Sequence, residues 1–112
     1  MSVQNDYLKN RFTERYNNAV NGIQLFKACI DMLEGIKEER GVKEAVEGFI
    51  NSLSGYSVCE EDMNLTKQIF DEFVSKQMSK NETVAYFNYL HDTAYSKAHN
   101  MLLIQDIFKC YF

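Results

Sequence analysis

Residues 12–33 read FTERYNNAVNGIQLFKACIDML, and apolar side chains recur along this stretch at alternating steps of four and three residues. The residues in this register are Phe12, Tyr16, Ala19, Ile23, Phe26, Ile30 and Leu33. Because an α-helix turns once every 3.6 residues, the spacing predicts one long helix with a continuous apolar seam. This helix is expected to run from about residue 4 to about residue 38, and other helices must cover its seam.

Three further stretches have helical spacing, at residues 42–53, 58–78 and 80–112. Ser57 with Glu60, and Ser79 with Glu82, match the capping box that begins many helices, and the second box leaves a break of at most two residues. The chain contains no proline, which removes the commonest breaker of long helices. The sequence therefore predicts an all-α, antiparallel bundle of about four helices, with two long outer helices and two shorter central ones, in a single domain spanning 1–112.

Gly22 raises the question of a bend, and the basic residues near the helix ends have structural explanations. Gly22 lies inside the first predicted helix among three asparagines, so a kink is an open question at this turn. Arg40 and Lys43 are spaced to pair with glutamates along the second helix, and Lys76 and Lys80 complement the dipole at the end of the third. No chemistry is assigned to these four basic residues.

Charge and cysteine content narrow the classes of protein. The formal net charge is −4, and the twelve Lys and Arg residues are scattered, which argues against a nucleic-acid partner. Cys29, Cys59 and Cys110 are far apart and odd in number, which favours a reducing compartment. No leader and no run of about 20 apolar residues is present, so the chain is expected to be cytoplasmic and to make no membrane contact.

The sequence contains no recognisable motif for catalysis or metal binding. His91 and His99 lie eight residues apart on one helix, about 12 Å along its axis, which is too far for both to ligate one zinc ion. An intersubunit metal held by His91 with Asp92, or by His99, stays an alternative. No glycine-rich phosphate loop and no G-x-S-x-G elbow is present. The sequence favours a protein that is not an enzyme and needs no metal or cofactor.

The C-terminal stretch, residues 101–112, reads MLLIQDIFKCYF and is apolar nearly all round a helix. One neighbouring helix cannot cover such a stretch, so we expect it to contact a second subunit, as a homodimer, or a protein partner. An aromatic residue in the loop at 52–57 is a further candidate. The predicted contact residues are Leu102, Leu103, Ile107, Tyr111, Phe112 and Tyr56.

Two functions from different classes fit these observations. The first is a non-enzymatic protein-binding factor that acts stoichiometrically, such as an immunity protein or a phage-type inhibitor of a host or defence enzyme. The alternative is a helical oligomer that binds or sequesters a small anionic ligand such as a nucleotide. Its candidate anion-binding pair is Arg11 and Arg15, with Tyr7 and Tyr16 able to stack on a base.

Overall fold

The structure is a computed structural model that describes residues 3–38 and 40–108 of the chain. It confirms an all-α bundle of about four helices, namely α1 (Val3–Gly35), α2 (Val42–Ser52), α3 (Glu60–Val74) and α4 (Lys80–Phe108). A short 3-10 turn, η1 (Leu53–Gly55), follows α2. The molecule is a rod whose Cα atoms extend over 59 × 22 × 20 Å.

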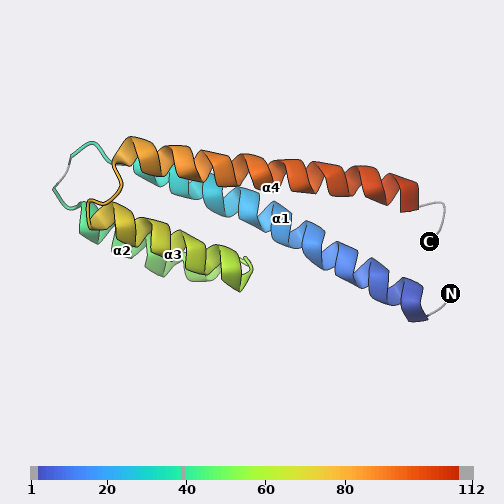
Figure 1. The fold of residues 1–112 in the computed structure, drawn as a ribbon. Helices are drawn as coiled ribbons and strands as arrows, with labels where there is room; N and C mark the ends of the chain where they lie inside the picture. Colours follow the sequence, from blue (N-terminus) through green and yellow to red (C-terminus); the bar gives the residue numbers. More distant parts are fainter. Residues whose placement is uncertain (1–2, 39, 109–112) are drawn as a thin grey trace.

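The two long helices, α1 and α4, run antiparallel and pack against each other, and α2 and α3 lie together on one side of this pair (Figure 1). The short helices cover only the part of the pair where α1 ends and α4 begins. We call this four-helix part the bundle half. We call the rest the arm, which consists of residues 3–18 of α1 and 95–108 of α4.

The boundary between the two parts is fixed by contacts around Gly22. The Asn21 side-chain amide donates a hydrogen bond to the Ser57 carbonyl, just before α3. A Cβ atom placed on Gly22 would lie 3.2 Å from Asp62 Oδ2 and 3.8 Å from the Cβ of Ala94. Glycine therefore allows α1, α3 and α4 to approach closely here, and α1 continues as a helix through this position.

The core of the bundle half is built on four phenylalanines, one from each helix. Phe70 of α3 is the centre, with its ring 5.7 Å from that of Phe49 in α2 and 5.1 Å from that of Phe87 in α4. Phe26 of α1 continues the chain of rings, 6.3 Å from Phe87. Such tilted and edge-on pairs stabilise a core beyond the area that they bury. These contacts join all four helices into one unit.

The buried face of α1 is wider than the predicted seam. Leu25 and Cys29, which lie outside the seam, are fully buried, whereas Ile23 and Ile30 of the seam are only half-buried. The reason is that the second half of α1 contacts both α4 and the short helices, so two faces are covered. The seam residues Ala19, Phe26 and Leu33 are buried as expected.

The predicted end of the first helix and the capping box predicted for the third helix are wrong. The first helix ends at Gly35, not near residue 38, because the Ile36 carbonyl accepts a hydrogen bond of 2.7 Å from Lys80 Nζ and Ile36 packs on the core. Ser57 with Glu60 forms no capping box, since α3 begins at Glu60 and Cys59 occupies the cap position without a side-chain hydrogen bond.

The second capping box is confirmed. The Glu82 amide donates to Ser79 Oγ at 3.1 Å, and the Ser79 amide donates to Glu82 Oε1 at 3.3 Å. Before it, α3 ends at Val74 and not at residue 78, so five residues separate α3 from α4 in place of the predicted two or fewer. The short break is therefore wrong, although the start of α4 is right.

A Schellman motif explains why α3 ends early. The Gln77 amide donates to the Glu72 carbonyl at 2.9 Å, and the Lys76 amide donates to the Phe73 carbonyl at 3.1 Å. This motif requires a left-handed residue, which is usually glycine, and here it is Lys76 with φ of 67°. A lysine in this conformation costs roughly 1 kcal/mol relative to glycine.

Candidate functional site

The arm displays apolar side chains that the bundle half does not cover. Met101 is buried against α1, but the next three residues of α4, Leu102, Leu103 and Ile104, are 43%, 53% and 40% exposed. Successive helical residues point about 100° apart, so these three side chains surround the outer side of the helix. Tyr7 on α1 and Tyr95 on α4 add two exposed aromatic rings to the arm.

The other predicted contact residues fall in three places. The backbone of Ile107 belongs to α4, but its side chain lies outside the described residues, as do Tyr111 and Phe112 entirely. Tyr56 is exposed in the loop between η1 and α3, and this loop lies at the foot of the arm because Asn21 holds its Ser57 carbonyl. The structure thus brings the Tyr56 loop and the arm to neighbouring positions.

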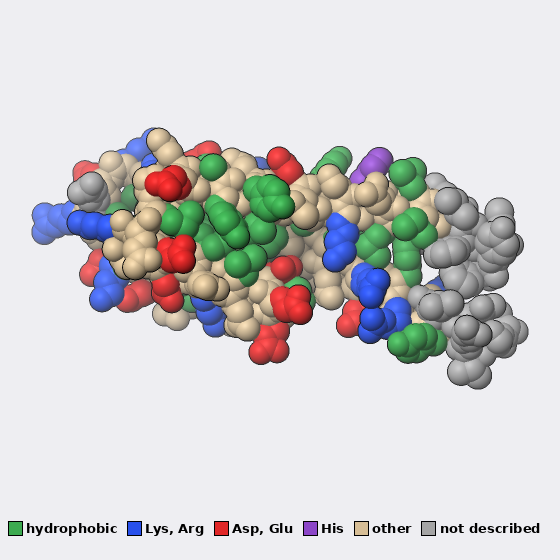
Figure 2. Space-filling model, viewed as in Figure 1, with side chains coloured by type: hydrophobic (Ala, Val, Ile, Leu, Met, Phe, Trp, Pro, Cys, Tyr) green, Lys and Arg blue, Asp and Glu red, His purple; other side chains and the backbone are tan. Residues whose placement is uncertain are grey.

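A hollow of about 500 Å³ lies at the foot of the arm, where α3 begins. Arg15 and Lys97 line it from the arm, and three consecutive acidic residues of α3, Glu60, Glu61 and Asp62, line it from the bundle half. Arg11 lies one helical turn from Arg15, so both residues are on the same face of α1. Figure 2 shows basic side chains on the arm beside acidic side chains near the beginning of α3.

The surroundings of the predicted anion-binding pair, Arg11 and Arg15, are mixed in charge. Of the two arginines only Arg15 lines the hollow, and the carboxylates there outnumber the cations. A carboxylate near a cationic site disfavours a bound anion by like-charge repulsion. Tyr7 is exposed on the same helix and Tyr16 is half-buried.

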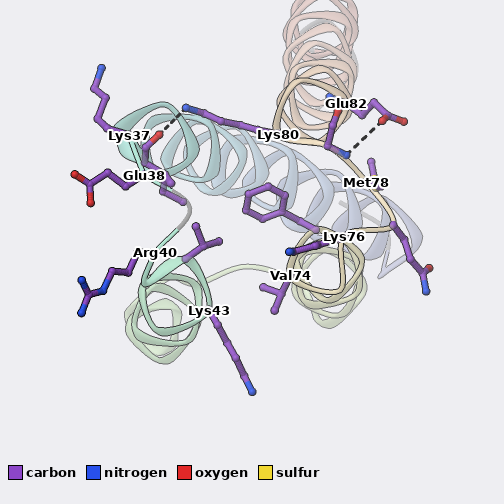
Figure 3. A pocket seen from close by; sticks show the side chains of 14 residues that line it. Lys37, Glu38, Arg40, Lys43, Val74, Lys76, Met78, Lys80 and Glu82 are labelled. Atoms are coloured by element: carbon purple, nitrogen blue, oxygen red, sulfur yellow. Dashed lines mark hydrogen bonds between the residues drawn. The ribbon is translucent and has the colours of Figure 1, made fainter.

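A larger hollow, of about 890 Å³, lies at the opposite end of the rod, among the ends of the helices of the bundle half (Figure 3). Among the residues that the structure describes, five basic and two acidic ones line it, and the basic residues are Lys37, Arg40, Lys43, Lys76 and Lys80. Sequence reasoning missed this hollow because the five residues come from two loops, from α2 and from the start of α4, which lie far apart in the sequence. The predicted ion pairs of Arg40 and Lys43 with glutamates of α2 are not found among the described residues.

The described cysteines and His91 differ in burial and in their contacts. Cys29 is fully buried, and burial raises the pKa of its thiol from 9.0 to about 12, so it stays protonated and unreactive at neutral pH. Burial also raises the pKa of Cys59. His91 Nδ1 lies 3.2 Å from Asp92 Oδ1. Within residues 3–38 and 40–108, no group of three His, Cys, Asp or Glu side chains is placed to hold a metal ion.

None of the helices in the described part of the chain is both long enough and apolar enough to cross a membrane. No protein-family model matches this chain, and comparisons with curated proteins and with solved structures found no significant match.

Proposed function

We propose that this chain is a non-catalytic protein-binding factor and that the arm is its contact surface. The observation that carries the proposal is the run of exposed apolar residues Leu102, Leu103 and Ile104 on a part of the molecule that α2 and α3 do not cover. Contiguous exposed apolar surface on a small domain marks an interaction site. Immunity proteins and phage-type inhibitors are examples of such stoichiometric protein-binding factors.

The chemistry of the arm favours a protein over other partners. Protein interfaces are enriched in tyrosine, arginine and large aliphatic residues, and the arm combines Tyr7, Tyr95 and Arg11 with its exposed leucines. Lys and Arg are too few and too close to carboxylates for a phosphate backbone. The rigid, regular helices of the arm suit docking of one preformed surface against another.

The first partner in this proposal is a second copy of the chain. The arm is about 22 Å long at 1.5 Å per residue, so the arm of another copy can lie beside it in the position that α2 and α3 occupy in the bundle half. In an antiparallel pairing about a two-fold axis, the free end of one arm meets the foot of the other arm, beside Glu60 and Glu61 of the other copy. The paired arms then form a second four-helix segment.

The size of this contact sets the expected affinity. A face of this length and two helices wide presents on the order of 600 Å² per copy, which is near the lower end of specific interfaces. We therefore expect a homodimer that forms at micromolar concentration and dissociates on dilution.

Replacing two exposed arm residues with glutamate tests the proposal. In the double variant Leu103→Glu with Ile104→Glu, buried charge at the contact is expected to convert the dimer into a folded monomer of 13.1 kDa. Sedimentation equilibrium gives the mass of the intact chain and of the variant over a range of concentrations, and circular dichroism checks that the variant is folded.

A matched control places the same two charges elsewhere on α4. Tyr86 and Tyr89 are exposed on the part of α4 that belongs to the bundle half, so Tyr86→Glu with Tyr89→Glu is expected to leave the mass at that of the dimer. A dimer that persists in the arm variant, or that is lost equally in the control, would contradict the arm as the contact surface.

A further inference from the structure

We infer that the 890 Å³ hollow at the end of the bundle half binds an organic phosphate, meaning one or more phosphate groups attached to a flat or apolar body. This inference does not rest on the arm, because the hollow lies at the other end of the rod (Figures 1 and 3). Three features of the hollow support a ligand of this kind, namely the charge of the rim, the apolar floor and the conformation of Lys76.

The rim of the hollow is positive in a chain whose net charge is −4. Four of its cations, Lys37, Arg40, Lys43 and Lys76, make no hydrogen bond or ion pair with other described residues. Lys80 is held by the Ile36 carbonyl, and the Glu82 carboxylate is held by the Ser79 amide. Several free cations around one concave site suit a ligand with two or more negative charges.

The floor of the hollow is apolar. The aliphatic and aromatic side chains that line it come from the end of α3, the start of α2 and the loops that follow α1 and α3. They are Ile36, Val42, Phe73, Val74 and Met78. Four of them, all except Met78, pack against the hydrophobic core, so the floor is continuous with the core of the bundle half. Pockets of this size that combine an apolar surface with a few charged groups are typical of small-ligand sites. A bare inorganic anion would leave this floor unused.

Lys76 is the residue that the fold directs into the site. Its side chain points toward the middle of the hollow, whereas Lys37, Arg40 and Lys43 extend outward from the rim (Figure 3). This lysine occupies a left-handed position, φ 67°, where glycine would be more stable. Strained backbone positions that keep an unfavourable side chain are concentrated at functional sites. An ammonium group placed as a point charge is a common phosphate ligand.

The test is a titration of the intact chain with three probes, in which binding is measured by calorimetry or by NMR chemical-shift changes. ADP and naphthyl phosphate carry phosphate on a flat body, and inorganic pyrophosphate carries charge alone. We expect both organic phosphates to bind and each to bind more tightly than pyrophosphate. Failure of both organic phosphates to bind, or equal binding of pyrophosphate, would overturn the inference.

Two lysine variants separate the site from general electrostatics. Lys76→Gly is expected to raise Tm by roughly 3–6 °C, because glycine relieves the left-handed strain, and to weaken binding of the organic phosphates about fivefold. Lys67→Ala removes the same charge from an exposed position of α3 outside the hollow and is expected to leave binding unchanged. Equal weakening in the two variants would contradict a specific role for Lys76.

Discussion

Replacing Phe87 with alanine is expected to lower the free energy of unfolding by about 3–5 kcal/mol, the largest effect of any single substitution discussed for this chain. Phe87 is fully buried and its ring contacts those of both Phe26 and Phe70, so its removal leaves a cavity at the junction of α1, α3 and α4. A domain of this size is stable by only about 5–15 kcal/mol, and the variant is therefore close to unfolding at ambient temperature. Urea unfolding followed by circular dichroism measures the difference.

The matched control for this substitution is Tyr89→Ala on the same helix. Tyr89 is exposed, so its loss is expected to change the free energy of unfolding by less than about 0.5 kcal/mol. Similar losses in the two variants would mean that the rings of the bundle half do not form the core described above.

Raising the pH above 9.0 is expected to destabilise the protein through Cys29, whose buried thiol has its pKa raised from 9.0 to about 12. The unfolded chain loses this proton above pH 9.0 and the folded chain keeps it until about pH 12, so this contribution to stability is complete below 9.0 and declines between the two values. At pH 10.5 the free energy of unfolding is expected to be lower by about 2 kcal/mol from this group alone.

Comparison with Cys29→Ala isolates the effect of the thiol. All other ionisable groups are common to both proteins, and the cavity left by alanine costs the same at every pH. Only the slope of stability against pH therefore isolates the thiol of Cys29. The slope between pH 8 and pH 10.5 should be steeper in the parent chain, since about 1.4 kcal/mol is lost per pH unit above the unfolded pKa. Parallel slopes would show that Cys29 is accessible to solvent in the folded protein.

Local patterns predicted those parts of the fold that depend on a few neighbouring residues. The spacing from Phe12 to Leu33 identified α1, and Ser79 with Glu82 identified the start of α4 from a hydrogen-bonding pattern within four residues. Ser57 and Glu60 have the same sequence pattern but form no capping box. The Ser57 carbonyl instead accepts a hydrogen bond from Asn21, in a distant part of α1.

Features that depend on the meeting of separate segments could not be predicted. The burial of Leu25 and Cys29 requires α2 and α3 to lie against a second face of α1, and no periodicity within α1 reports this. The basic hollow assembles residues from two loops and from the starts of α2 and α4. Lys76 gives no signal of a helix end, because glycine is the residue expected there. The exposed end of α4, in contrast, was recognised from its composition.

Small-angle scattering of the intact chain tests most directly the claim that the arm is a protein contact surface occupied by a second copy. Two rods whose Cα atoms extend over 59 Å, overlapping along arms of about 22 Å, should give a particle about 95 Å long at concentrations where the dimer forms. A particle that keeps the length of one rod at every concentration would contradict the account, whether it is a monomer or a dimer that pairs side by side along the bundle half.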